Sequence, residues 1–158
     1  MAKAAILVSA LCFLAIATFA HAQQKVYNTY GGVYCDPCNV EFHTRLSYPI
    51  PGARVQVQCR NRDTNAVTVT KEGWTNNDGG YSIDVIGDHE EEICEVSALS
   101  SPDAKCNVPF TNADKARVLL TENSGVQGTS RYANPIGFKT TTPDAGCKDV
   151  LAELGMTV

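Results

Sequence analysis

Alternation of apolar and polar residues is the strongest pattern along this chain. In residues 53–60 every second side chain is small or apolar, which is typical of a β-strand with one buried face. The residues on that face are Ala53, Val55, Val57 and Cys59. The same period recurs in 94–98, so Cys94 is also expected to point inward. Two inward cysteines on separate strands are candidates for one disulfide bridge.

Weaker strand patterns follow the same logic elsewhere in the chain. They occupy residues 26–34, with an interruption at Gly31-Gly32, and 67–74, 81–85, 117–120 and 136–138. The segment 39–52 contains two prolines and predicts a loop or an irregular edge segment. Residues 76–80, Asn-Asn-Asp-Gly-Gly, favour a hairpin turn because these residue types tolerate positive φ. Residues 101–109 indicate a loop.

Helical periodicity is confined to the C-terminal segment. There Cys147, Val150, Leu151 and Leu154 follow one another at helical spacings, which predicts a short helix. The short strands and frequent turns predict an all-β fold, an antiparallel β-sandwich or small barrel of about seven strands. The aromatic residues Trp74, Tyr34, Tyr81 and Tyr132 are expected to fill the inside of that sandwich rather than to form a sugar-stacking platform.

The N-terminus has the pattern of a secretory signal peptide. Lys3 precedes an apolar run that ends at Ala20-His21-Ala22, so we expect residues 1–22 to be removed by cleavage between Ala22 and Gln23. The alternative is a membrane anchor, but a run of about 16 residues falls short of the roughly 20 that span a bilayer. Membrane insertion is therefore not expected, and residues 23–158 are interpreted as one domain.

The net charge of the chain argues against one class of function, nucleic-acid binding. The formal net charge is -4, and no basic run occurs. Nucleic-acid binding proteins usually carry a basic patch, so this sequence is not expected to bind nucleic acid.

The cysteines allow three interpretations. Cys12 lies in the predicted leader, which leaves Cys35, Cys38, Cys59, Cys94, Cys106 and Cys147. An even number in an exported chain favours disulfides. The close pair Cys35 and Cys38 is also compatible with a redox centre, although no helix is predicted to follow it as thioredoxin-like chemistry requires. A zinc site would need two further ligands, and the predicted mature chain has only His43 and His89 as histidines.

No catalytic constellation is found. The sequence lacks a nucleophile elbow and any paired carboxylates at a suitable spacing, and His43 is interpreted as a loop residue. Residues 76–80 lack the acidic spacing of a calcium loop. No enzyme activity and no cofactor are therefore expected. Candidate surfaces for a partner are the loop after the cysteine pair, with Asn39 and His43, and the acidic turn formed by Glu90, Glu91 and Glu92.

Residues 31–38, Gly-Gly-Val-Tyr-Cys-Asp-Pro-Cys, resemble the signature of the pollen Ole e I-like proteins. Blocks elsewhere are also similar to the family, among them Asp78-Gly79-Gly80-Tyr81 and the run from Arg131 to Phe138. The resemblance implies a secreted plant protein with a disulfide-stapled β fold. It further implies the bridges Cys35–Cys106, Cys38–Cys147 and Cys59–Cys94, of which strand alternation suggested the last independently.

The function that the resemblance implies is extracellular binding or signalling, with roles in pollen hydration, pollen-tube growth or cell-wall-associated signalling. The expected partner is an extracellular protein such as a receptor kinase, or a component of the cell wall. One alternative is a structural cell-wall protein. Another is a protease-inhibitor-like module, for which residues 103–110 around Cys106 would supply the rigid exposed loop.

Overall fold

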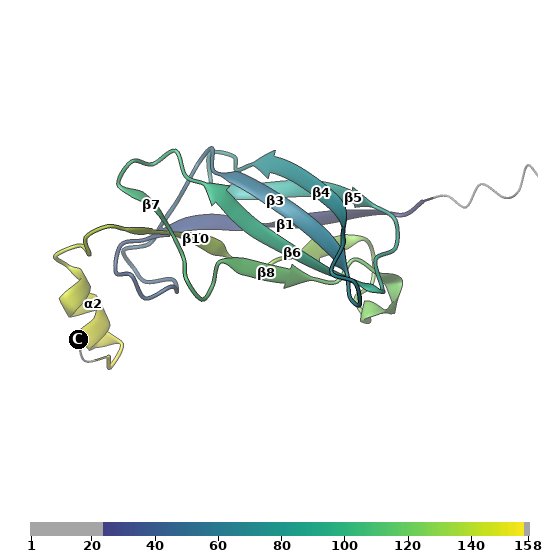
Figure 1. Ribbon diagram of the computed structural model, residues 1–158. Helices are drawn as coiled ribbons and strands as arrows, with labels where there is room; N and C mark the ends of the chain where they lie inside the picture. Colours follow the sequence, from purple (N-terminus) through teal and green to yellow (C-terminus); the bar gives the residue numbers. More distant parts are fainter. Residues whose placement is uncertain (1–23, 157–158) are drawn as a thin grey trace, which may run out of the picture.

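The computed structural model describes residues 24–156. The predicted signal peptide and the cleavage between Ala22 and Gln23 lie outside the described residues. The described chain forms two β-sheets packed face to face, with a short helix at one end (Figure 1). The strands are β1 (Val26–Asp36), β2 (Tyr48–Pro49), β3 (Arg54–Asn61), β4 (Val67–Trp74), β5 (Gly80–Ile86), β6 (Glu92–Ser100), β7 (Cys106–Pro109), β8 (Lys115–Val118), β9 (Ser130–Tyr132) and β10 (Ile136–Thr140).

Two helical segments complete the described chain. The 3-10 turn η1 comprises Glu122–Ser124, and the helix α2 comprises Cys147–Glu153. The structure therefore confirms the predicted C-terminal helix, whose buried face consists of Cys147, Val150 and Leu151. No helix in the described range 24–156 is long and apolar enough to cross a membrane.

Strand β1 organises the larger, six-stranded sheet. Its first half pairs with β5 in antiparallel fashion and with β9 in parallel fashion. From Val33 onward the same strand pairs with β10 in parallel fashion and with β2 in antiparallel fashion, and β7 extends the sheet beyond β10. The smaller sheet is antiparallel, in the order β4-β3-β6-β8.

The core lies between the sheets and follows the period of two. The four residues predicted to share a face, Ala53, Val55, Val57 and Cys59, are all fully buried. Facing them from the larger sheet are fully buried side chains that include Tyr27, Val33, Val85 and Phe138. An all-β sandwich is therefore confirmed as the fold class, with ten strands in the described residues rather than about seven.

The predicted interruption at Gly31-Gly32 is wrong, since β1 runs through both glycines. A Cβ at Gly31 would lie 2.8 Å from the Ala133 carbonyl oxygen and would also meet the Tyr81 hydroxyl. Gly31 therefore allows close approach of neighbouring segments instead of ending the strand.

The predicted hairpin at 76–80 is a turn, but the two strands that it joins do not pair. Strand β4 pairs with β3, whereas β5 crosses to the other sheet and pairs with β1. The turn itself follows the expected chemistry: Asn76 Oδ1 accepts the backbone N–H groups of Asp78 and Gly80 at 3.0 and 2.9 Å. Gly79 adopts a φ of 72°.

The expectation that the four named aromatic residues fill the sandwich holds for Tyr81, which belongs to the buried core. Tyr34 is also buried, but it is not part of that core and packs instead against His43 and Phe110. Trp74 and Tyr132 are 65% and 56% exposed, because Trp74 ends the edge strand β4 and Tyr132 ends β9 on the outer face of the larger sheet. Exposed aromatic side chains on a rigid sheet are features that a binding surface uses.

Candidate functional site

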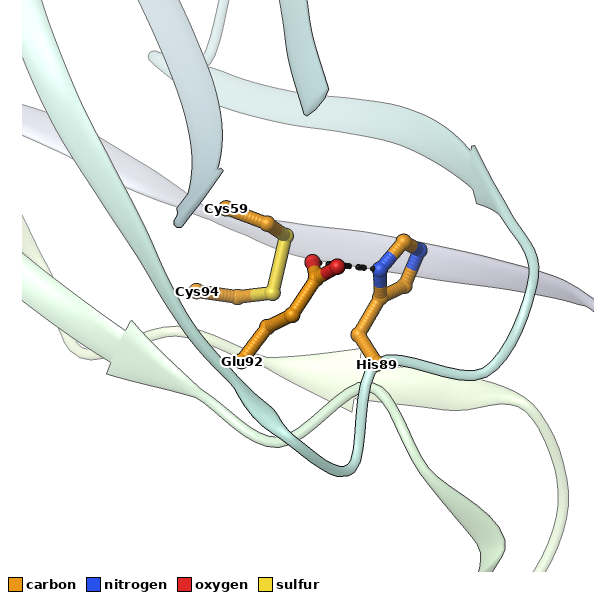
Figure 2. Close-up of side chains that lie close together, drawn as sticks. All are labelled: Cys59, His89, Glu92 and Cys94. Carbon is orange, nitrogen blue, oxygen red and sulfur yellow. Dashed lines mark hydrogen bonds and ion pairs between the residues drawn. A yellow bond between two sulfur atoms is a disulfide. The ribbon is translucent and has the colours of Figure 1, made fainter. Parts of the chain in front are cut away.

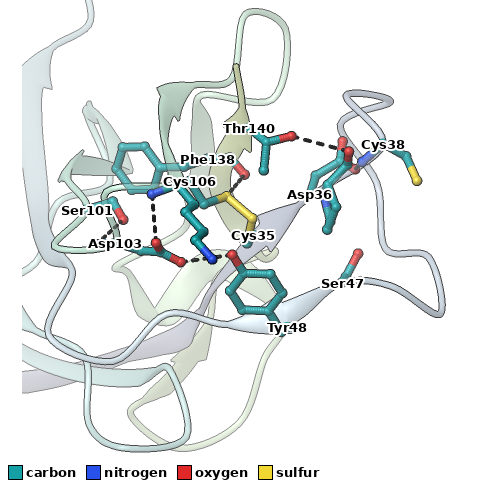
Figure 3. The surroundings of a disulfide bond; sticks show 12 residues. Cys35, Asp36, Cys38, Ser47, Tyr48, Ser101, Asp103, Cys106, Phe138 and Thr140 are labelled. Atoms are coloured by element: carbon teal, nitrogen blue, oxygen red, sulfur yellow. Dashed lines mark hydrogen bonds between the residues drawn. A yellow bond between two sulfur atoms is a disulfide. The ribbon is translucent and has the colours of Figure 1, made fainter. Parts of the chain in front are cut away.

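The three disulfides join Cys35 to Cys106, Cys38 to Cys147 and Cys59 to Cys94, the same pairs that the family resemblance implies. Figure 3 shows the surroundings of the first. Each half of the close cysteine pair is therefore bonded to a distant segment, one to β7 and the other to α2. A thiol engaged in such a bridge is neither a nucleophile nor a metal ligand, which removes the redox and zinc interpretations for this pair in the oxidised protein.

The loop after Cys35 is held by a buried aspartate. Asp36 is fully buried, and its carboxylate accepts the backbone N–H groups of Cys38, Val40 and Glu41 at 2.8, 2.6 and 2.6 Å. Three such hydrogen bonds to a charged acceptor fix the course of the loop. This role gives a structural reason for an aspartate inside the Cys-Asp-Pro-Cys motif.

Glu41 continues this arrangement toward the next segment. Its carboxylate accepts the N–H groups of Thr111 and Asn112 at 2.6 and 2.7 Å, and Lys139 Nζ lies 3.2 Å away. Burial by itself would raise the pKa of Glu41, but these donors outweigh it and lower the pKa from 4.5 to about 2. Two carboxylates in series thus fasten the loop to β10 and to residues 111–113.

Beside this loop lies a surface groove of about 320 Å³, called the tyrosine groove below. Its lining includes Tyr34, His43, Tyr48, Pro49, Tyr132 and Pro135. The imidazole of His43 stacks on the Tyr34 ring at 3.7 Å between centroids, with 22° between the planes. Tyr132 packs against Tyr30 at 5.6 Å, which continues the aromatic surface outside the groove.

Two phenols of the groove, those of Tyr34 and Tyr48, have raised pKa values. Burial, followed by the charge of Asp36, raises the pKa of Tyr34 to about 12. Burial and a hydrogen bond to Asp103 raise the pKa of Tyr48 to about 12. Tyr48 donates this bond to Asp103 Oδ2 at 2.8 Å (Figure 3). The groove therefore offers neutral aromatic faces and hydroxyl groups, which suit packing and hydrogen bonding better than proton transfer.

The structure separates the residues predicted as a partner surface. His43 lines the groove, and Asn39 lies in the same loop with a φ of 58°. The acidic turn lies at the opposite end of the sandwich, in the connection between β5 and β6 (Figure 1). There the Glu92 carboxylate accepts a hydrogen bond from Thr68 and contacts His89, so it is engaged internally. Glu90 accepts from Asn123 at 2.7 Å.

Sequence reasoning did not identify the groove, because its lining comes from four separate segments. The sequence places Tyr48 in an irregular loop and predicts Tyr132 as a core residue. The available signal was the position of Tyr34 and His43 on either side of the cysteine pair, and of Tyr132 close to Pro135.

The segment considered for protease inhibition, 103–110, is not a free loop. It contains β7, which pairs with β10, and its residues Cys106 and Phe110 are buried. Cys106 Sγ also lies 3.3 Å from the Phe138 carbonyl oxygen. Because this sulfur is in a disulfide and carries no proton, the contact is not a hydrogen bond. Ala104, Lys105, Asn107 and Pro109 are exposed, so the segment is a surface strand and turn held in the sheet.

Fold and groove together define a disulfide-braced β-sandwich with an aromatic surface groove and tethered loops. The family model described as "Pollen protein Ole e 1 like" matches residues 25–155. The chain belongs to this family.

Similar proteins include the anther-specific protein LAT52 of Solanum lycopersicum, 46% identical over 99% of this chain and 97% of the relative. The Olee1-like protein of Betula pendula is 41% identical, over 99% and 96%. The crystal structure of the major plantain pollen allergen Pla l 1 superposes with a TM-score of 0.69 at 29% identity, covering 78% of this chain and 100% of that one. These names describe pollen and anther proteins and state no enzymatic activity.

Proposed function

We propose that the chain is a secreted, non-enzymatic protein that binds an extracellular protein partner through the tyrosine groove. The observation that carries the proposal is the groove itself. There His43, stacked on the buried Tyr34 ring, and the exposed Tyr48 and Tyr132 present aromatic surface beside a loop fixed by two disulfides. Aromatic side chains dominate the binding energy of protein interfaces, and a rigid scaffold reduces the entropy lost on binding. Disulfides accord with passage through an oxidising secretory route.

The chemistry of the groove supports binding rather than catalysis. His43 stacks on Tyr34, and the neighbouring phenols hold their protons because their pKa values are raised to about 12. Phenols that hold their protons do not act as general bases. Neutral aromatic faces favour a partner with apolar and hydrogen-bonding groups, such as the outer domain of a receptor kinase at a pollen or pistil cell surface.

The test is a binding measurement with matched variants. Tyr132→Ala removes an exposed ring from the groove, and His43→Ala removes the stacked one. Labelled protein is titrated onto wall-free pollen cells and, separately, onto isolated pollen walls. We expect each variant to bind wall-free cells about tenfold more weakly than wild type, the scale of an interface hot spot. Leu119→Ala, a half-exposed apolar position outside the groove lining, is the control and should bind like wild type.

Two results would contradict the proposal. Equal binding by Tyr132→Ala, His43→Ala and Leu119→Ala would remove the groove as the recognition surface. Binding to isolated walls alone, released only by high salt or a chelator, would favour the structural cell-wall alternative.

We expect no inhibition across a protease panel, since segment 103–110 is held in the sheet.

A further inference from the structure

Four side chains with metal-binding chemistry converge away from the tyrosine groove (Figure 2). Cys59 and Cys94 come from β3 and β6, while His89 and Glu92 come from the connection into β6 and from its first residue. One ligand atom from each lies within 4.8 Å of every other. The two cysteines are buried and His89 is only 8% exposed, so the cluster is largely shielded from water.

The histidine is oriented as a metal ligand would be. Its Nε2 lies 3.2 Å from the carbonyl oxygen of Ile86, and its Nδ1 lies 2.8 Å from Glu92 Oε2. In the tautomer whose Nε2–H donates a hydrogen bond to this carbonyl, the Nδ1 lone pair faces the Glu92 carboxylate, and a cation bound by both groups removes the repulsion between them. Metal-bound histidines commonly donate their second N–H to a backbone carbonyl in this way. Thr68 Oγ1 holds the same carboxylate oxygen at 2.7 Å.

The disulfide closes this cluster to metal ions. While Cys59 and Cys94 are bonded to each other, their sulfurs are not thiolates, and thiolate is the form that binds metals. A dithiol reductant opens the bridge by giving it two electrons. The reductant becomes a disulfide, and Cys59 and Cys94 become two thiols. Each thiol then releases one proton to solvent as its sulfur binds the metal.

We propose that reduction of the Cys59–Cys94 bridge creates a zinc site formed by Cys59 Sγ, Cys94 Sγ, His89 Nδ1 and a Glu92 carboxylate oxygen. Two sulfurs, one imidazole nitrogen and one carboxylate oxygen form a tetrahedral set that suits Zn²⁺. Bond lengths of about 2.0–2.3 Å place such ligands roughly 3.5 Å apart. The two sulfurs must therefore separate from their bonded distance of 2.05 Å, while the longer separations in the cluster, which reach at most 4.8 Å, must shorten.

The strand register supports a shared metal ion. Cys59 and Cys94 lie directly opposite each other in the β3–β6 pair, with 4.0 Å between their Cα atoms. Zinc would therefore replace the disulfide as the link between the same two strands. The link between β3 and β6 would then persist in both oxidising and reducing surroundings.

The first test uses Co²⁺ as an optical probe of zinc sites. The disulfide-bonded protein is reduced with a phosphine, which is a weaker metal ligand than a dithiol, and titrated with Co²⁺ and then Zn²⁺. We expect tetrahedral, thiolate-to-cobalt absorption that saturates at one ion per chain and is abolished by zinc. The oxidised protein should show none. His89→Gln should weaken binding by about tenfold or more, the scale at which even changes to outer-shell partners act.

His43→Gln is the matched control, because His43 stacks on Tyr34 in the groove and is not part of the cluster. Equal cobalt binding by the two glutamine variants would overturn the proposal. So would reduced wild-type protein that gives no tetrahedral absorption.

A second measurement needs no variant. Reduced wild-type protein is treated with a thiol-alkylating reagent with and without zinc, and the modified cysteines are identified by peptide mass spectrometry. We expect zinc to slow alkylation of Cys59 and Cys94 while leaving the other four cysteines reactive. Protection of all six cysteines, or of none, would contradict a site formed by this cluster.

Discussion

At the scale of single residues, two carboxylates determine the shape of the loop after Cys35. Asp36 and Glu41 both accept backbone N–H groups, and Glu41 does so from a left-handed conformation with a φ of 59°. A non-glycine residue is held in that region when its surroundings compensate for the cost. Here the compensation is the set of donors from residues 111–113 and Lys139.

Glu41 predicts a specific loss of stability in acid. Its folded-state pKa of about 2 lies below the ordinary 4.5, so its contribution is complete above about pH 4.5 and is lost as pH falls toward 2. Glu41→Gln should lower the free energy of unfolding at neutral pH by on the order of 2–3 kcal/mol and flatten the stability profile across that acid window. Urea unfolding at several pH values measures both effects.

Glu153→Gln is the control for that experiment. Glu153 pairs with Arg45 on the surface at 3.2 Å, and exposed pairs contribute less than about 1 kcal/mol. An acid limb in Glu41→Gln as steep as that of wild type would show that the carboxylate does not have this role.

At the scale of elements, the parallel pairing of β1 with β10 positions the part of β1 that carries Tyr34 of the groove. It brings Tyr34 opposite Gly137. A Cβ on Gly137 would collide with the Tyr34 carbonyl oxygen and would lie 3.2 Å from the Phe110 ring. Only glycine fits this position without moving one of the two strands.

Gly137→Ala should therefore destabilise the protein by about 2 kcal/mol or more, as expected for overpacking in a buried site. Gly32→Ala is the matched control on β1, because its Cβ would approach nothing closer than the Gly79 oxygen at 3.9 Å. Thermal unfolding of the two variants compares them directly. A Gly137→Ala protein as stable as Gly32→Ala would mean that the strands shift apart without cost.

The same scale shows what the sequence could predict. Alternation identified β3, β5 and β6 and the inward faces of Cys59 and Cys94, because a period of two is a local property of a half-buried strand. Turn residues at 76–80 predicted a reversal, yet could not indicate that β5 crosses to β1, since pairing depends on the whole core. Strand β9 is not predictable from alternation, because it is only three residues long and its central, inward-facing residue is Arg131.

Arg131 is a charged residue in a buried position, which the sequence alone does not predict. Its guanidinium donates to the carbonyls of Leu119, Thr121 and Gly128 at 2.8 to 2.9 Å and lies 4.9 Å from the centre of the Tyr27 ring. Those partners come from a loop that has no periodicity. The groove could not be predicted from the sequence either, because the segments that line it are brought together by long-range strand pairing.

At the scale of the whole molecule, two disulfides attach the end of β1 and the loop after it to the second half of the chain. The Cys38–Cys147 bridge links residues 109 positions apart and anchors α2, whose Val150 and Leu151 are buried.

Replacing Cys38 and Cys147 by serine should lower the free energy of unfolding by about 4 kcal/mol and release α2 from the sandwich. Hydrogen exchange should show faster exchange at residues 147–154, with β3 and β6 little changed. The Cys59→Ser, Cys94→Ser double variant is the comparison, and unchanged exchange at α2 in the first variant would contradict this role.

The central position of β1 has a consequence for biosynthesis. Strand β1 is synthesised before its partners β9 and β10, so its pairing in the sheet is complete only after those strands have been synthesised. During translation Cys35 and Cys38 therefore emerge long before Cys106 and Cys147, and the first partners available to them are each other and Cys59. We expect premature bridges to form and then to be reshuffled by a disulfide isomerase, so that correct oxidation is reached only after the chain leaves the ribosome.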